Sequence, residues 1–274
     1  MKYKLICIDM DGTLLDDNHN ISDENYKAIK EAQKKGVMVV LCTGRLLTSA
    51  KHYAEELGIN DPIIASNGTF IVGKNKSEIL YKESFSLEES IIIYKMLEKH
   101  NINTYYFNTF NSAISKKPFP KDHPYGITNA KAKDENKIKL IVNQDLEAVI
   151  KKCSSEILKA IAIEENDINK IMKAKEEIKK LDMFEVVSSS SNNFEVMKKG
   201  SSKGNAVKTL ANLLGVKREE VVCIGDNEND ISMIKYAGFG VAMGNACDGL
   251  KKEAKYITDS NNNSGVAKAM LQII

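Results

Sequence analysis

Residues 5–15 read LICIDMDGTLL and join an apolar run to a pair of acidic residues. The run LICI is typical of a strand covered on both faces. Asp9 and Asp11 follow it directly, where such a strand would leave the hydrophobic core. An acidic pair after a strand is often only a solvated turn. The stretch by itself therefore predicts a strand, and the purpose of the two acids depends on what the rest of the chain brings to the same place.

The first third of the chain alternates strand and helix patterns. ISDENYKAIKEAQKKG predicts a helix with Ser22 as its N-cap and Gly36 as its end. The apolar run VMVVLCT at 37–43 predicts a second buried strand, and PIIASNG at 62–68 a third, with the helix TSAKHYAEELG between them. This βαβαβ order predicts a parallel sheet with helices on both faces.

The middle of the chain changes character and the last third returns to the first pattern. Helices and short strands from about residue 84 to about residue 190 predict a separate α+β domain. The strand EVVCIGD at 220–226, flanked by helices, resumes the alternation. A sheet that begins before an insertion and ends after it is one domain. We therefore predict an α/β core of residues 1–83 and 192–274 with an inserted domain over 84–191.

Composition excludes several classes of protein. A net charge of +2 over 274 residues does not favour a nucleic-acid or membrane partner. Apolar runs fall short of the roughly 20 residues that cross a bilayer, and the N-terminal run is too short for a signal peptide. The five cysteines form no CxxC pair and no zinc spacing. We expect a cytoplasmic setting, and the oligomeric state is not indicated.

Four short motifs fall at the places where a parallel sheet carries its chemistry, the carboxyl ends of strands. Asp9 and Asp11 follow the first strand, and Thr43 in LCTGR ends the second. Asp226 in IGDNENDISM ends a late strand. Lys203 in GSSKG opens a helix, where a cation opposes the helix dipole unless it serves an anion bound there. Each residue has a structural alternative, a turn or a helix cap, but neighbouring strands would bring all of them into one crevice.

Phosphoryl transfer is the chemistry that fits these side chains. Clustered carboxylates repel one another and imply a hard divalent cation, and Mg²⁺ takes few protein carboxylates beside water and phosphate. One aspartate can attack phosphorus. A second can protonate the leaving oxygen and then deprotonate water. A hydroxyl, a lysine and backbone amides would bind the transferred oxygens.

The motifs DMDGT, LCTGR, GSSKG and GDNENDISM, in this order, resemble the four motifs of the haloacid dehalogenase-like (HAD) hydrolases. The stretches FGVAMGNA and YITDSNNNSGVA resemble the Cof-type subgroup, and an insertion between the second and third motifs resembles the C2-capped branch. The resemblance implies a Rossmann-like core and a cap that closes over the crevice. It also implies an Mg²⁺-dependent phosphatase that hydrolyses small phosphorylated metabolites, sugar phosphates first, through an aspartyl-phosphate.

The resemblance further implies a role for each acid of the motifs. Asp9 would be the nucleophile and a metal ligand. Asp11 would be the general acid and base, with its backbone carbonyl on the metal. Asp226 would complete the metal site, and Asp230 would orient Lys203 or the water shell of the metal.

The remaining candidates are binding and supporting residues. The phosphoryl oxygens would be bound by the amides of Met10 and Gly44 and by the side chains of Thr43, Lys203 and Asn229. Arg45 and Asn67, in TGR and SNG, would order the site or meet the substrate. Candidate substrate contacts of the inserted domain are Tyr105, Tyr106, Phe107 and His123. For the three aromatic residues, core packing is the favoured alternative.

Two other functions stay open at this point. A phosphomutase on the same scaffold would return the phosphoryl group to a sugar instead of to water, although the Cof-like tail favours hydrolysis. A regulator that binds a phosphorylated ligand would keep the fold but would have lost the enzymatic activity. The intact set of Asp9, Asp11, Lys203 and Asp226 argues against the regulator.

Overall fold

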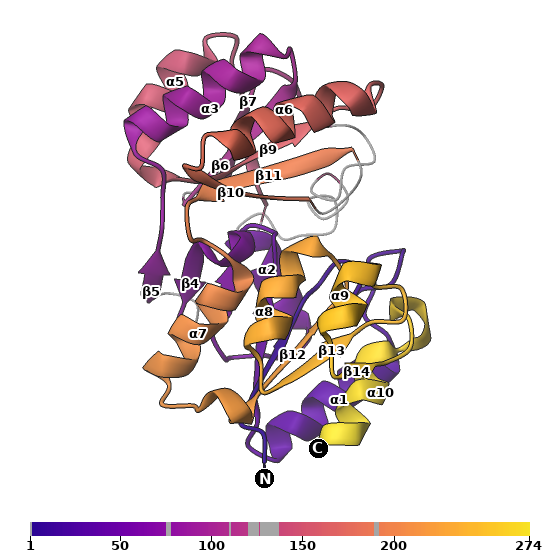
Figure 1. Cartoon of the computed structure of the whole chain (residues 1–274). Coiled ribbons are helices and arrows are strands. Elements are labelled where there is room, and N and C mark those ends of the chain that lie inside the picture. The colour runs from indigo at the N-terminus through magenta and orange to yellow at the C-terminus, as the bar shows by residue number, and fades with distance from the viewer. Residues whose placement is uncertain (1, 75–77, 110, 120–125, 127–136, 189–191) are drawn as a thin grey trace. The chain divides into compact units, whose positions relative to one another are not determined.

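A computed structural model describes most of the chain, namely residues 2–74, 78–109, 111–119, 126, 137–188 and 192–274 (Figure 1). The chain falls into two compact units, each built on its own sheet. The first comprises Met1–Gly44, Tyr53–Leu80 and Ser202–Ile274, and the second Arg45–His52 and Tyr81–Ser201. Within the described residues, the helices are all too short or too polar to cross a membrane.

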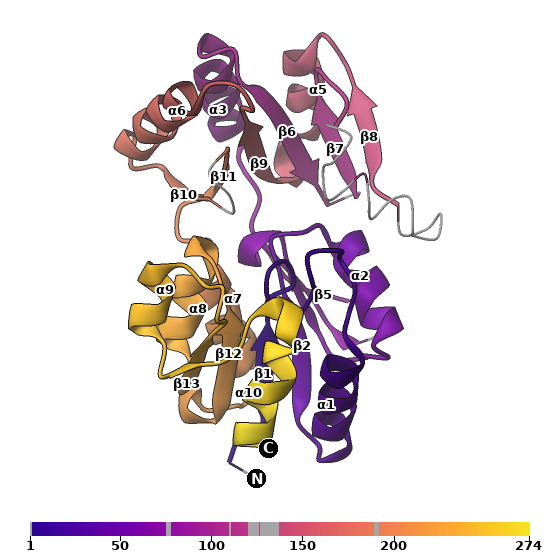
Figure 2. The same cartoon turned by 90° about the vertical axis from the view of Figure 1, so that its right-hand side faces the viewer.

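The first unit is built on an eight-stranded sheet of order β14-β13-β12-β1-β2-β3-β4-β5, part of which can be followed in Figure 2. The strands from β14 to β3 run parallel, and β4 runs antiparallel to β3. β1 lies between β2 and β12, so segments from both ends of the chain meet at the centre of the sheet. The strands are β1 (Leu5–Ile8), β2 (Met38–Cys42), β3 (Ile63–Ala65), β4 (Phe70–Val72), β5 (Ile79–Lys82), β12 (Val221–Gly225), β13 (Phe239–Ala242) and β14 (Tyr256–Ile257).

Helices connect these strands and cover the sheet. Helix α1 begins after Ser22, whose hydroxyl accepts from the amide of Asn25, and Gly36 follows its end with φ +80°, so both predicted helix signals are confirmed. The first turns of α2 are grouped with the second unit. The helices are α1 (Asp23–Lys34), α2 (Leu47–Glu56), α7 (Lys203–Leu213), α8 (Ile231–Tyr236), α9 (Asp248–Glu253) and α10 (Gly265–Ile273). The predicted parallel α/β core is confirmed.

The second unit is an α+β layer of six strands in the order β10-β11-β9-β6-β7-β8. Neighbouring strands are antiparallel except β7 and β8. Its strands are β6 (Asn103–Asn108), β7 (Ser112–Ser115), β8 (Lys139–Val142), β9 (Ile157–Ile163), β10 (Phe184–Val187) and β11 (Asn193–Lys198). Its helices are α3 (Leu87–Lys99), α5 (Leu146–Cys153) and α6 (Ile168–Lys180), and they pack on one face of the sheet (Figure 1).

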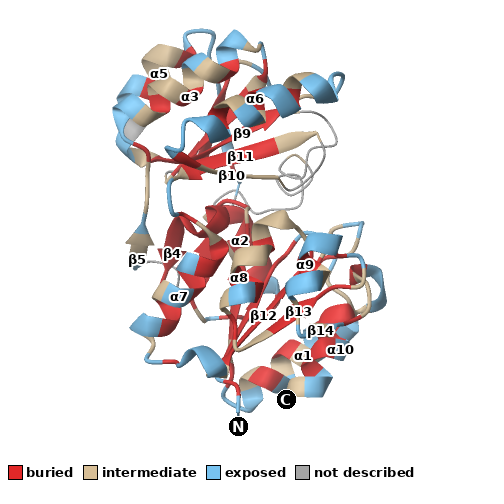
Figure 3. Cartoon of the chain, viewed as in Figure 1, coloured by how far each residue is buried: buried red, intermediate tan, exposed pale blue. Residues whose placement is uncertain are grey.

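Strand β6 shows how the second unit is packed. Its side chains alternate between the two faces of the sheet. Tyr106 packs with the helices, whereas Tyr105 and Phe107 face the other side. All three are fully buried, as their alternative interpretation as core residues requires. Figure 3 shows buried residues in the same way along much of β11 and along β12 of the other sheet. His123 lies outside the described residues.

Strand β11 belongs to the smaller sheet although it lies after the domain boundary predicted from the sequence. It pairs antiparallel with β9 and β10, so the smaller sheet continues to Lys198. The sequence-based boundary starts the returning core at residue 192. The bounds of the core and of the inserted domain therefore stay a prediction.

Candidate active site

Three aspartates and a lysine meet at the carboxyl edge of the first unit's sheet. β1 and β12 are parallel neighbours with Ile8 opposite Ile224, so Asp9 and Asp226, which follow these strands, reach the same edge. Lys203 is the first residue of α7, and its Nζ lies 2.5 Å from Asp9 Oδ1 and 2.6 Å from Asp230 Oδ1. Lys203 and Asp230 are fully buried, and Asp9 and Asp226 are 5% and 9% exposed. The structure thus brings together acids from the first and fourth motifs and the lysine of the third.

Asp230 is held by three donors. Its Oδ1 accepts from Lys203, and its Oδ2 accepts from the backbone amides of Asp226 and Asn227 at 3.0 and 3.1 Å. A buried carboxylate with this many donors is fixed in orientation. Asp230 therefore fixes Lys203 and the chain that carries Asp226.

The cluster holds three carboxyl groups and one ammonium group, and this imbalance affects their pKa values. Burial, with the charges of Asp230 and Asp226, raises the pKa of Asp9 well above its usual range against the opposing effect of Lys203. Burial and Asp230 raise the pKa of Asp226 to about 7. Burial disfavours the charged form of Lys203, but Asp230 and Asp9 outweigh it and raise the pKa of its ammonium. A further cation would relieve this excess of negative charge.

The carboxylates fit a divalent metal ion. One oxygen from each of Asp9, Asp226 and Asp230 lies within 4.8 Å of the others. Carboxylate oxygens are the ligands that Mg²⁺ prefers. Lys203 and two amides already occupy Asp230, so Asp9 and Asp226 are the acids with coordinating capacity left.

Asp11 is placed differently from the other acids. Its side chain is 43% exposed, and its Oδ1 lies 3.7 Å from His19 Nδ1. The chain turns directly after Asp11, at Gly12, which has φ +75°. A Cβ on Gly12 would lie 2.5 Å from Asp226 Oδ2, so the turn passes close over that carboxylate. The structure does not bring the Asp11 carboxylate into the buried cluster.

Thr13 is a residue of this cluster that the sequence did not single out. Its buried Oγ1 donates to Asp226 Oδ1 at 2.7 Å. In the sequence it is the last residue of the motif DMDGT. The alternation of Asp9, Asp11 and Thr13, each with an oxygen-bearing side chain, is the one signal that could have indicated it.

Asn67 joins the second motif to the fourth. The backbone amide of Asn67 donates to the backbone carbonyl of Thr43 at 3.0 Å, and its side-chain Oδ1 accepts from Asn229 Nδ2 at 3.1 Å. A Cβ on Gly44 would lie 2.9 Å from Asn67 Oδ1, so these residues are closely packed. Ser66, Asn67 and Gly68 have successive φ values of 51°, 56° and 92°. Left-handed backbone at non-glycine residues is strained, and such strain clusters at functional sites.

Met10 and Arg45, two further predicted residues, are both buried. The side chain of Met10 is fully buried, and its carbonyl accepts from the amides of Thr13 and Leu15, which reverses the chain after β1. Arg45 is buried and donates from its guanidinium to Ser49 Oγ at 3.2 Å. Arg45 is grouped with the second unit, whereas the acids and Lys203 belong to the first.

The comparison with known proteins identifies the family. A family model described as haloacid dehalogenase-like hydrolase matches residues 6–270, and the chain belongs to this family. The 5-amino-6-(5-phospho-D-ribitylamino)uracil phosphatase YcsE of Bacillus subtilis is 38% identical over 268 residues, covering 97% of this chain and 94% of the relative. Phosphatase YwpJ of the same organism is 30% identical over 293 residues, covering 99% and 100%. A solved haloacid dehalogenase-like hydrolase from Bacteroides thetaiotaomicron superposes with a TM-score of 0.82 at 30% identity and covers 100% of both chains.

These findings confirm three of the sequence-based predictions. The fold is that of the HAD hydrolases. The Cof-type subgroup is confirmed by the family model and by the relatives that match the chain. The enzyme class, a phosphoric monoester hydrolase of this family, is confirmed as well.

Proposed function

We propose that the protein is an Mg²⁺-dependent phosphatase that hydrolyses small phosphate monoesters through a covalent intermediate on Asp9. The observation that carries this proposal is the buried cluster in which one lysine is shared between Asp9 and Asp230 while Asp226 lies beside them. Such a cluster offers a nucleophilic oxygen, a fixed cation and a metal site at one sheet edge.

Asp9 is the nucleophile in this proposal. Lys203 holds its Oδ1, which leaves Oδ2 to attack phosphorus. The P–O bond to the leaving group breaks as the Asp9–phosphorus bond forms. Water then attacks the phosphorus, releases inorganic phosphate and restores the carboxylate. The ammonium of Lys203 contacts the other oxygen of the same carboxylate, from where it would stabilise the negative charge on the transferred group.

Asp11 is the general acid and base. Its exposed carboxylate, outside the buried cluster, can gain and lose a proton without breaking the contacts of Lys203. It would protonate the leaving oxygen in the first half of the reaction and take a proton from the attacking water in the second. His19 Nδ1 lies 3.7 Å from this carboxylate.

The other motif residues bind and position. The amides of Met10 and Gly44 and the side chains of Thr43 and Asn229 would receive the phosphoryl oxygens. Asn67 supports this group because it contacts Thr43 and Asn229.

Asp9, Asp226 and the backbone carbonyl of Asp11 would hold Mg²⁺. The bound ion would offset the excess negative charge of the cluster and of the substrate phosphate. Asp230 positions Lys203 from the opposite side.

The proposed substrates are small phosphorylated metabolites. The relative YcsE is named for a phosphorylated ribitylamino-uracil, which combines a sugar-alcohol phosphate with a base. Sugar phosphates and related phosphorylated metabolites are accordingly the first candidates for this chain. We place the reaction in the cytoplasm, which suits five free cysteines, three of them buried. In this proposal residues 84–191 form the cap that selects the substrate, with no nucleic-acid or membrane partner.

A screen of phosphorylated metabolites, read as inorganic phosphate released and ranked by kcat/KM, tests the proposal. We expect Mg²⁺-dependent release by the wild type and none by Asp9→Asn, which keeps the size of the side chain. Isomerised sugar phosphate without phosphate release would identify a phosphomutase instead. Binding without turnover of any substrate, including p-nitrophenyl phosphate, would identify a regulator.

A further inference from the structure

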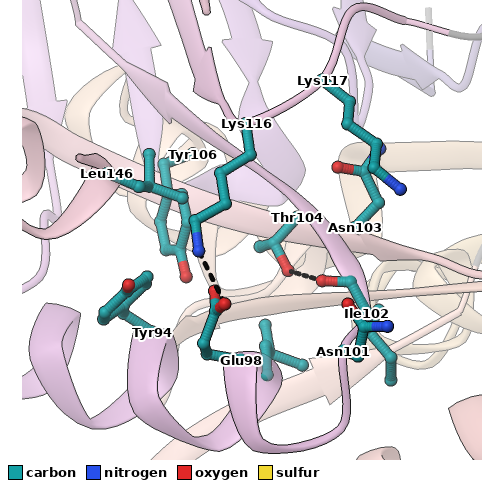
Figure 4. A pocket seen from close by; sticks show the side chains of 11 residues that line it. Tyr94, Glu98, Asn101, Ile102, Asn103, Thr104, Tyr106, Lys116, Lys117 and Leu146 are labelled. Atoms are coloured by element: carbon teal, nitrogen blue, oxygen red, sulfur yellow. Dashed lines mark hydrogen bonds and ion pairs between the residues drawn. The ribbon is translucent and has the colours of Figure 1, made fainter. Parts of the chain in front are cut away.

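The second unit contains a cavity of about 50 Å³ on the helix side of its sheet. It lies between the end of α3, the start of β6 and the start of α5, and Glu98, Thr104 and Leu146 are among its lining residues (Figure 4). A single water needs roughly 10–15 Å³, so this volume suits a molecule of a few heavy atoms. The lining residues all belong to the second unit, and the predicted acids and Lys203 are not among them.

A buried hydroxyl faces this cavity without an acceptor. Tyr106 is fully buried, and within the described residues its Oη has no hydrogen-bond partner. Burial, with smaller contributions from Tyr94 and Glu98, raises the pKa of Tyr106 well above its usual value. The hydroxyl therefore stays protonated and is a donor. A buried donor without an acceptor is unfavourable, which points to a bound partner.

A weak ion pair lines the same cavity. Lys116 Nζ lies 2.6 Å from Glu98 Oε1 and 5.7 Å from the centre of the Tyr94 ring. The two charged side chains are 30% and 47% exposed, and ion pairs this exposed contribute little, so this pair opens at small cost. In Figure 4 the Tyr106 hydroxyl points toward the side of the cavity where Lys116 and Glu98 meet. With Lys117, the lining carries two lysines against one glutamate, a net charge of +1.

We propose that this cavity binds a small carboxylate. Its oxygens would accept a hydrogen bond from Tyr106 and pair with the ammonium of Lys116, which turns from Glu98 at the surface. Its short aliphatic part would pack on Leu97 and Leu146, which are buried. An organic ammonium ion fits less well, because it offers donors only and leaves the Tyr106 proton without an acceptor. Such an ion would also compete with Lys116 for Glu98.

Acetate is the probe for this site. Sodium acetate is titrated into the full-length protein at fixed pH and ionic strength, balanced with sodium chloride, and saturation transfer to the acetate methyl group is measured by NMR. We expect saturable binding by the wild type and at least tenfold weaker binding by Tyr106→Phe and by Lys116→Met. Tyr105→Phe is the matched control, because that hydroxyl contacts Asn103 and the Pro118 carbonyl instead. It should bind acetate like the wild type.

Thermal unfolding gives a second and independent readout. Tyr106→Phe keeps the ring and removes an unsatisfied donor, so without acetate its Tm should equal or exceed that of the wild type. Acetate should raise the Tm of the wild type and leave that of the variant unchanged. A lower Tm of Tyr106→Phe in acetate-free buffer would mean that the hydroxyl is already satisfied, and would overturn the proposal. Equal acetate affinity in the two proteins, absence of saturable binding, or preference for methylammonium chloride would overturn it too.

Discussion

Lys203→Met should destabilise the first unit strongly, because it removes the cation from between two buried carboxylates. Methionine is similar in length and apolar, so the change removes the charge and little volume. Lys203 Nζ lies 2.5 Å from Asp9 Oδ1 and 2.6 Å from Asp230 Oδ1. In the variant no cation would stand between these two carboxylates. The prediction concerns stability in chelator, apart from any effect on turnover.

The magnitude follows from the burial of this ion pair. Removing one partner of a buried ion pair costs about 3–5 kcal/mol, since an uncompensated charge is left behind. Lys203 pairs with two carboxylates and is fully buried, so we expect the upper end, about 5 kcal/mol. This is a large part of a total stability of about 5–15 kcal/mol. At about 2–4 °C per kcal/mol, the expected fall in Tm is about 10–20 °C.

The assay is thermal and urea unfolding in EDTA, with Lys208→Met as the control at an exposed position of the same helix. The double variant Lys203→Met, Asp230→Asn should recover stability, because asparagine keeps an oxygen for the amides of Asp226 and Asn227 and removes the surplus charge. Mg²⁺ should also raise the Tm of Lys203→Met more than that of the wild type. A Lys203→Met protein that is as stable as Lys208→Met in EDTA would refute this account of the cluster.

Three further changes test other contacts. Thr13→Val removes the donor to Asp226, so the Mg²⁺ concentration for half-maximal activity should rise about 10–100-fold, while Thr13→Ser stays near wild type. An unchanged Mg²⁺ requirement would contradict this. Gly68→Ala places a Cβ 2.4 Å from the Ser202 carbonyl at φ +92°, so Tm and kcat should both fall, whereas Gly200→Ala, with φ +84° and open space, should lower Tm only. Equal kcat values of the two variants would mean that the turn at residues 66–68 does not affect catalysis. Hydrogen bonds from His100 and then from Lys99 lower the pKa of Glu177 to about 2. The ionised Glu177 therefore stabilises the folded protein above the pKa that it has in the unfolded chain. This stabilisation is lost as the pH falls from about 5 to about 2. The urea midpoints of the wild type and Glu177→Gln should converge over that range, and a constant difference would exclude this ion pair as the cause.

The sequence predicted the long and strongly patterned elements of the fold. The runs around β1, β2 and β12 are apolar without a break because both faces of these strands are covered. Helix α1 carries its own boundary signals at Ser22 and Gly36.

Four strands were not predicted, namely β4, β5, β7 and β11. β4 has three residues and β7 has four, too few for a period-two pattern to stand out. β11 follows a serine and asparagine run that reads as a linker, and its place in the sheet is decided by pairing with β9 and β10. Long-range pairing of this kind leaves little trace in a local pattern.

The candidate site was predictable to the extent that sheet topology determines it. Once β1 and β12 are neighbours, Asp9 and Asp226 must share an edge, and the sequence places Lys203 at a helix start nearby. What the motifs do not specify is how these charges are distributed among partners. Asp11 looks equivalent to Asp9 on the sequence, yet the turn at Gly12 directs it toward His19 and solvent.

In the proposed mechanism, this distribution separates the groups that would stay charged from Asp11, which would exchange protons. A proton donor inside the cluster would share the surroundings of Asp9 and Asp226, where burial and then the charge of Asp230 raise the pKa of both carboxyl groups. Each protonation there would change the hold of Lys203 on the nucleophile. Outside the cluster, Asp11 can change its charge while the ion pairs of Lys203 persist. One residue separates the two acids, and this spacing would serve the proposed reaction because Asp9 is buried directly after β1 whereas Asp11, just before the turn at Gly12, is exposed.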